Sequence, residues 1–205
     1  NAPEPEPIPE PPASGQKRGT DFIQLKENLF AIALNPDNQT ANDSSKLYLF
    51  EVQDNKPTIV NNSPIIISYD PDDNPNNYNQ EIGTDLKVAF NKSSNTLLVS
   101  AKNLGIWSFD LTDPTSPVEL DSFYRYTNDE LGIGDLGLVN DLEISPRDEN
   151  MLLAGTSRGL FAFDISNPSD LKLIHHMQTS ARDINDIAFS PDGEKILVSG
   201  NRAGL

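Results

Sequence analysis

The chain has 205 residues, no cysteine and a formal net charge of −16, which arises from 31 acidic and 15 basic side chains. This length is sufficient to bury a core, and the lack of cysteine excludes disulfides, thiolate metal sites and a cysteine nucleophile. The acidic charge argues against nucleic acid or an anionic membrane as the main partner. A low apolar content of 36%, with 12 glycines and 16 prolines, predicts many short elements joined by turns.

Residues 1–20 form the first distinct segment, which holds six prolines and three glutamates within its first twelve positions. Ile8 is its only large apolar side chain, so the segment is predicted to be a disordered, extended Pro/Glu-rich tether. No run of 18 apolar residues occurs, and no transmembrane segment is predicted. An acidic stalk before a cysteine-free β domain favours an exported protein that is tethered through this stalk, with a cytoplasmic protein carrying a disordered tail as the alternative.

A repeat organises the chain from residue 85 onward. Residues 97–114 align without a gap on residues 151–168, and residues 141–155 align without a gap on residues 186–200. Both alignments share the same middle copy, which predicts a period of about 45–55 residues.

Each copy contains an alternating strand, a polar turn, a compact apolar strand, a third strand that begins at glycine, an Asx-Pro turn and a more polar fourth strand. A divergent first copy fits the same template, although Glu51 stands where later copies have aspartate. Four short antiparallel strands per period are typical of a β-propeller blade, so an all-β propeller with about three and a half blades is predicted. The predicted blades are 21–61, 85–123, 139–177 and an incomplete 184–205.

The third and fourth strands of two copies carry a family resemblance. The segments GIWSFDLTDPTSPVEL (105–120) and GLFAFDISNPSDLKLI (159–174) resemble the LVIVD repeat of bacterial and archaeal surface β-propellers. INDIAFSPDGEKILVSG (184–200) resembles the wider WD40-like pattern. The resemblance implies a propeller fold and an extracytoplasmic location at the cell surface, in the periplasm or secreted. It transfers no catalytic residue to this chain.

The fourth copy ends where its third strand is expected to begin, at Gly204-Leu205. Closed propellers usually have four to eight blades. The sequence therefore predicts a partial propeller, completed by further chain or by another propeller chain.

The connections between copies are unequal in length, and this inequality points to an interaction surface. Those at 62–84 and 124–140 are long, whereas the one at 178–185 is short. Propeller topology sends them to one face, where insertions often carry function. Aromatic and arginine side chains, which protein interfaces favour, occur in or beside the long connections: Tyr69, Tyr78, Tyr124, Arg125 and Tyr126. The alternative is that these side chains pack the loops onto the blades.

The longest connection also holds oxygen ligands in a pattern that suggests calcium. Its candidate ligands are Asp70, Asp72, Asn74 and Glu81, at positions 1, 3, 5 and 12 of an EF-hand-like loop. Pro75 occupies the position where that loop needs a glycine with positive φ, so a conventional EF-hand is excluded. A looser calcium site and a solvated Asx-rich loop remain as alternatives.

Asn-Asp pairs begin two inner strands, so Asp141 and Asp186 are placed near the mouth of the central channel. There they could bind a cation, as in a lactonase-like propeller hydrolase, or accept backbone donors from neighbouring blades. His175 and His176 are adjacent on a fourth strand, where alternation turns them to opposite faces, so they cannot share a metal.

No catalytic residue is assigned from the sequence. The favoured interpretation is a non-enzymatic propeller that binds a protein or surface ligand through its long loops, and deletion of 69–81 or 124–135 is expected to abolish binding. A propeller hydrolase and a structural segment of a larger surface assembly are the alternatives.

Overall fold

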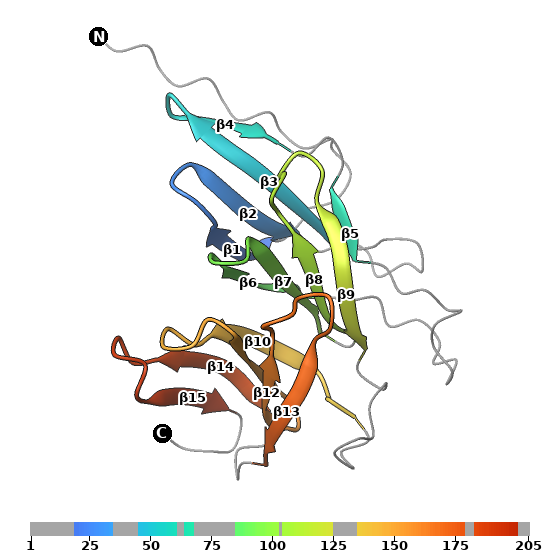
Figure 1. Cartoon of the computed structure of the whole chain (residues 1–205), viewed down its shortest axis with the longest axis vertical. Coiled ribbons are helices and arrows are strands. Elements are labelled where there is room, and N and C mark those ends of the chain that lie inside the picture. The colour runs from blue at the N-terminus through green and yellow to red at the C-terminus, as the bar shows by residue number, and fades with distance from the viewer. Residues whose placement is uncertain are drawn as a thin grey trace.

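The structure, a computed structural model, describes residues 19–34, 45–60, 64–67, 85–102, 104–124, 135–178 and 183–200. These residues form strands that are arranged in four antiparallel sheets, with no helix in the described ranges. Figure 1 shows the sheets fanning out in chain order, from blade 1 at the N-terminal end to a two-stranded half-blade at the other end. The prediction of an all-β fold with four-stranded antiparallel blades is confirmed.

Blade 1 departs from the regular pattern in its outermost strand. Asp54 and Asn55 both have positive φ, of 51° and 61°, as in the type I′ turns that join hairpin strands directly. The C-terminal end of the third strand pairs with Lys56–Ile59, which follows this turn. Its N-terminal end pairs with a separate short strand, Ile65–Ile67. The strands are β1 (Gly19–Gln24), β2 (Leu29–Leu34), β3 (Ser45–Gln53), β4 (Lys56–Ile59) and β5 (Ile65–Ile67).

Blades 2 and 3 are regular four-stranded meanders, and half-blade 4 is a hairpin. Gly105 and Gly159 begin the third strands with φ of 132° and 126°, a backbone conformation that favours glycine. Blade 2 contains β6 (Lys87–Asn91), β7 (Thr96–Ala101), β8 (Gly105–Asp110) and β9 (Val118–Tyr124). Blade 3 contains β10 (Val139–Ile144), β11 (Met151–Thr156), β12 (Gly159–Asp164) and β13 (Lys172–Met177), and half-blade 4 contains β14 (Ile184–Phe189) and β15 (Ile196–Gly200).

The strand register corrects the gap-free alignment of blades 2 and 3. Thr96 lies opposite Asp110, and Met151 lies opposite Asp164, so Met151 is equivalent to Thr96 and not to Leu97. The turn between the second and third strands is one residue longer in blade 2, which shifts the second strand by one position.

The alignment of blade 3 with half-blade 4 needs the same correction. Leu142 lies opposite Ala154, and Ile187 lies opposite Val198, so Ala154 is equivalent to Val198 and not to Ser199. A one-residue slip exchanges the two faces of a strand. The corrected register directs Val198 toward the core.

Each blade has two faces, which we name by direction: the N-face is directed toward the preceding blade, and the C-face toward the next. The three apolar clusters lie between successive blades, each formed by one C-face and the following N-face. The C-faces carry mainly leucine, isoleucine and alanine, such as Ala31 and Leu49 of blade 1. The N-faces of blades 2 and 3 add aromatic side chains from their third strands: Trp107, Phe109, Phe161 and Phe163.

One position on the C-face always carries a small residue. The second strands place Ala33, Ser100, Gly155 and Ser199 at equivalent positions, opposite the inner strand. In blade 3 the next blade approaches closely, because a Cβ added to Gly155 would lie 2.7 Å from Ile184 Cγ2. A small side chain here is therefore required by the sheet-to-sheet distance.

We predict that Gly155→Ala lowers the free energy of unfolding by about 1–3 kcal/mol, because the added methyl group forces half-blade 4 away from blade 3. Urea denaturation followed by circular dichroism measures the change. Ser199→Ala is the matched control at the equivalent, exposed position, and we expect it to be nearly neutral. Equal effects of the two substitutions would contradict the packing argument.

Candidate functional site

The inner strands of the four blades carry a row of charged side chains at equivalent positions. The pairing partners of Ala33, Ser100, Gly155 and Ser199 are Asp21, Lys87, Asp141 and Asp186, respectively. The row therefore has an aspartate in every blade except blade 2. Sequence analysis identified Asp141 and Asp186 but missed Asp21 and Lys87, because the first two copies lack the Asn-Asp pair.

The aspartates of this row accept hydrogen bonds from the backbone of the next blade. Asp21 Oδ2 accepts the Val88 N–H at 2.9 Å, and Asp141 Oδ2 accepts the Ile187 N–H at 2.7 Å. Val88 and Ile187 occupy equivalent positions in their inner strands. The same carboxylate-to-backbone contact thus recurs at the junctions of blades 1 and 2 and of blade 3 and half-blade 4, and we call it the inter-blade latch.

The N–H at this position finds another acceptor when the preceding blade offers no aspartate. Blade 2 has Lys87 in the row, and the Leu142 N–H of blade 3 donates to its own neighbour, Asp141. Phe22 of blade 1, where the described structure has no preceding blade, likewise donates its N–H to Asp21 Oδ1 at 2.9 Å. The latch is therefore made between blades only where the preceding blade supplies the carboxylate.

Further side chains join the blades at other positions of the inner and outer strands. Asp121 Oδ2 accepts the Leu171 N–H at 2.7 Å, and Ser108 Oγ donates to the Pro168 carbonyl at 2.6 Å. Two asparagines, Asn91 and Asn140, donate from Nδ2 to carbonyls of the following blade at 2.7 and 2.8 Å. These hydrogen bonds fix the angle between sheets whose apolar faces alone would permit sliding.

Asp141 lies in an electrostatically unfavourable position. The pKa of Asp141 is raised to about 6, because burial and, to a smaller extent, the neighbouring Asp186 carboxylate outweigh the lowering effects of the Ile187 and Leu142 backbone hydrogen bonds and of Lys87. The pKa of Glu143 is also raised, first by burial and then by the charges of Asp141 and Asp186. The inner strands of blade 3 and half-blade 4 therefore concentrate negative charge.

We predict that Asp141→Asn stabilises the protein at pH 7 and not at pH 4. A raised pKa in the folded state contributes stability below about pH 4 that is lost as the pH rises through about 6. The asparagine carbonyl retains an acceptor for Ile187 without the charge. Because Asp141 is only half-buried, water screens part of the cost, and we expect a gain of about 1 kcal/mol or less.

Urea denaturation at the two pH values measures this effect. Asp141→Ala removes the acceptor and is expected to destabilise the protein at both pH values. If the asparagine and alanine variants behave alike, Asp141 does not act as a latch.

The other predicted site residues are not brought together by the described structure. The candidate calcium ligands Asp70, Asp72, Asn74 and Glu81, and the candidate interface residues Tyr69, Tyr78, Arg125 and Tyr126, lie outside the described residues, and Tyr124 is the last residue of β9. Within the described ranges, no three His, Asp or Glu side chains converge closely enough to hold a metal ion.

The two histidines have structural positions on the outermost strand of blade 3. His176 lies opposite Phe161 and stacks on its ring, with centroids 4.2 Å apart, whereas His175 lies opposite Ala162. His176 Nε2 is 3.1 Å from the carbonyl oxygen of Arg158. The prediction that the two rings point to opposite faces is therefore confirmed, and Phe161 is part of the inter-blade core.

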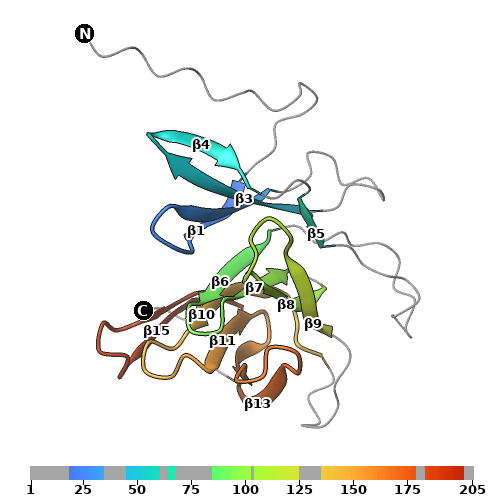
Figure 2. The same ribbon diagram turned by 45° about the horizontal axis from the view of Figure 1, so that its top comes forward.

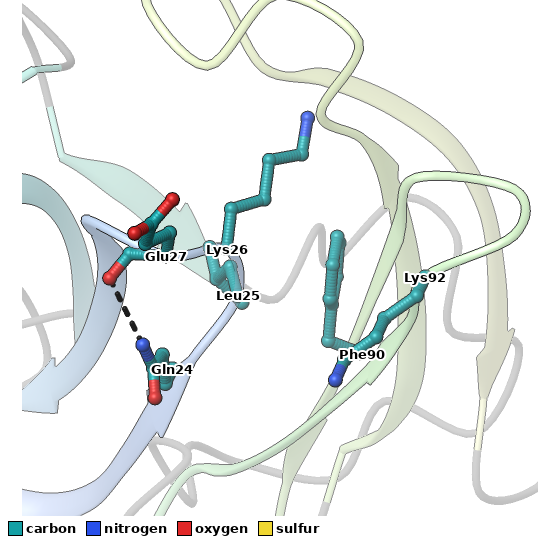
Figure 3. Close-up of a pocket in the computed structure, with 6 residues that line it drawn as sticks. All are labelled: Gln24, Leu25, Lys26, Glu27, Phe90 and Lys92. Carbon is teal, nitrogen blue, oxygen red and sulfur yellow. Dashed lines mark hydrogen bonds between the residues drawn. The ribbon is translucent and has the colours of Figure 1, made fainter.

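A hollow of about 360 Å³ lies between blades 1 and 2, where β1 and β6 end (Figure 3). The turn after β1 is held by a hydrogen bond from Gln24 Nε2 to the Glu27 carbonyl at 3.0 Å. The hollow is lined by Gln24, Leu25, Lys26, Glu27, Phe90 and Lys92. It lies at the opposite ends of the strands from the long connections. Sequence analysis did not identify it, because its residues come from two different blades.

Comparison with known proteins identifies the fold but no family. No protein-family model and no curated protein matches the chain. Among solved structures, a protein from Lactobacillus plantarum superposes with a TM-score of 0.65 at 13% identity, covering 91% of this chain and 49% of its own length. A luciferin-regenerating enzyme gives a TM-score of 0.58 at 13% identity, covering 90% of this chain and 54% of its own length.

The WD40 β-propeller domain of Doa1 superposes with a TM-score of 0.54 at 14% identity, covering 90% of this chain and 49% of the Doa1 domain. The chain thus spans about half the length of these proteins. The chain therefore contains part of a β-propeller, built from four-stranded antiparallel blades. That the chain belongs to the LVIVD-repeat family stays a prediction.

Proposed function

We propose that this chain is a propeller that binds a protein partner through the face bearing its long connections. The observation that carries the proposal is the use of the inner-strand aspartates: Asp21 and Asp141 hold the backbone of the next blade. Asp141, one of the two carboxylates that a cation-dependent propeller hydrolase would need, serves here to join blades. The WD40-like structural neighbour is consistent with an interaction role.

The topology gathers the insertion points of the long connections at one end of the sheets. The connection between β2 and β3, that between β5 and β6 and that between β9 and β10 all leave from this end, because successive strands are antiparallel. The second and third blades, which have buried apolar clusters on both faces, support the last two of them. Loops held by a rigid scaffold are typical binding elements.

We propose an extracytoplasmic location, on the basis of the cysteine-free acidic composition and the Pro/Glu-rich segment at 1–20. No helix among the described residues is long and apolar enough to cross a membrane. Fractionation of the source cells, with protease treatment of intact cells, tests the location.

A propeller hydrolase is the second candidate, and one observation favours it. Asp141, Glu143 and Asp186 lie on adjacent inner strands, and burial, followed by the charges of Asp141 and Asp186, raises the pKa of Glu143. A divalent cation would relieve this repulsion. The hydrolase candidate requires a bound cation whose ligands include Asp141 and Asp186.

We predict that replacing residues 69–81 or 125–134 with short Gly-Ser linkers abolishes cross-linking to the partner in extracts of the source cells. These boundaries keep β9 and the Asp135–Arg158 ion pair, whose atoms are 3.0 Å apart. Cross-linking mass spectrometry of the tagged chain measures the loss. Lys26→Ser combined with Lys92→Ser, at the opposite end of the blades, is the control. Unchanged cross-linking by both loop variants would contradict the proposal.

Calcium binding distinguishes a calcium site in the 69–81 loop from a cation site at Asp141 and Asp186. We predict that millimolar calcium raises the melting temperature and that Asp70→Asn combined with Asp72→Asn removes the rise, because carboxylates are preferred calcium ligands. Differential scanning fluorimetry measures both effects. A rise that survives the loop substitutions but disappears in Asp186→Asn would instead favour the hydrolase-like channel site, and no rise would exclude the loop site.

A further inference from the structure

The hollow between blades 1 and 2 has an apolar floor and a charged rim. Figures 1 and 2 show β1 of blade 1 beside β6 of blade 2, and the hollow lies where these two strands end. Leu25 and Phe90, which are 1% and 9% exposed, form the floor. Lys26 and Lys92 form the rim and are both exposed. Figure 3 shows Lys26 on one side of the Phe90 ring and Lys92 on the other.

The two lysines occupy equivalent positions in successive blades. The strand pairing places Lys26 and Lys92 at the same distance beyond the charged row of the inner strands. Blade 3 and half-blade 4 have Pro146 and Pro191 at this position. Two of the 15 basic side chains of a chain with a formal charge of −16 therefore meet at the one junction between described blades where both partners contribute a lysine.

The corresponding space between blade 3 and half-blade 4 is filled by the protein itself. A Cβ added to Gly193 would lie 2.7 Å from Arg147 Cγ and 3.0 Å from Pro146 Cγ. The Arg147 guanidinium donates to the Asp192 carbonyl and pairs with Glu194, in both cases at 2.7 Å. This junction is thus closed by side chains, and its cation is neutralised within the chain.

The two turns that flank the hollow are instead fixed separately, each within its own blade. The Leu25 N–H donates to the Leu29 carbonyl at 2.8 Å, and the Ser93 N–H donates to Asn91 Oδ1 at 3.0 Å. Within the part of the chain that the structure describes, no hydrogen bond or ion pair joins these two turns, and neither lysine of the rim forms an ion pair. The hollow is therefore preformed, and a ligand can supply a counter-ion to its lysines.

The acidic side chain of the lining does not offset this positive charge at the floor. Glu27 contributes its backbone carbonyl to the turn, where it accepts a hydrogen bond from Gln24 Nε2 at 3.0 Å. Its carboxylate points away from the Phe90 ring (Figure 3). Ammonium groups beside an apolar floor favour a ligand that combines a carboxylate with an apolar body, because the charges pair and the body is removed from water.

We propose that this hollow binds a small organic carboxylate, whose apolar body lies on Leu25 and Phe90 and whose charge pairs with the ammonium groups of Lys26 and Lys92. The volume of about 360 Å³ is near the lower end of the range for small-molecule sites, about 300–1,000 Å³. A ligand of about ten non-hydrogen atoms suits such a site. Because the hollow lies at the opposite ends of the strands from the long connections, this binding is separate from that of the proposed protein partner.

A nuclear magnetic resonance titration of the ¹⁵N-labelled full chain with phenylacetate, up to about 10 mM, tests the proposal. Saturable shifts are expected for the backbone amides of residues 24–27 and 90–92. We expect a dissociation constant of about 1 mM, because a ligand of this size makes few contacts in an open hollow. Phenylacetamide, which keeps the shape without the charge, and acetate, which lacks the apolar body, are each expected to bind about fivefold more weakly or less.

Lys26→Ser combined with Lys92→Ser is expected to weaken phenylacetate binding about fivefold, since each exposed ion pair contributes modestly. Lys56→Ser combined with Lys195→Ser is the matched control, because it removes the same charge from exposed positions elsewhere. The control variant should bind phenylacetate as the wild-type chain does, and circular dichroism checks that both variants are folded. The Lys26 and Lys92 variant is also expected to retain cross-linking to the protein partner, so the two proposals are tested independently.

Several results would overturn the carboxylate site. One is the lack of saturable shifts in residues 24–27 and 90–92 up to about 10 mM phenylacetate, about ten times the expected dissociation constant. Equal affinity for phenylacetamide or acetate would show that charge or the apolar body is not recognised. Equal affinities of the two double-lysine variants for phenylacetate would show that Lys26 and Lys92 do not form the site.

Discussion

Apolar packing between the C-face of one blade and the N-face of the next is the interaction on which the whole structure depends. No helix covers either face of a sheet in the described ranges, so each sheet excludes water only by means of its neighbours. All three core clusters accordingly lie between blades and none within a single blade. The same dependence explains why apolar side chains are exposed on the N-face of blade 1 and the C-face of half-blade 4, beside which the described residues place no further blade.

Directional hydrogen bonds supply what apolar packing cannot, namely the registration of one sheet against the next. The latch from Asp21 and Asp141, with the contacts of Ser108 and Asp121, ties backbone groups at both the inner and the outer strands. This use of carboxylates gives part of the acidic charge a structural role. It also creates the concentration of charge around Asp141 that any ligand of the inner strands would meet.

Much of the fold was predictable because strands and turns are encoded locally. The alternation Gly105–Asp110 and the Asx turns at Asp110 and Asp113, whose carboxylates accept the N–H groups of Thr112 and Thr115, depend on residues only a few positions apart. The gap-free alignments of the repeat copies placed the second strand one residue out of its observed register. Gap-free similarity cannot detect a turn that has lengthened by one residue while the apolar character of the strand is kept, as at Leu97 and Leu98.

The candidate site was less predictable, because it depends on contacts between blades. The sequence alone determined the all-β class, the order of strands, the number of blades present and the Asp-containing inner strands, since each follows from a two-residue period or from turn chemistry. Only the tertiary structure decided that Asp141 holds Ile187, that Asp21 and Lys87 belong to the same row, and that Phe22 is left exposed. These outcomes depend on which sheet lies against which face, and residues 46 or 67 positions apart meet only after the sheets have packed.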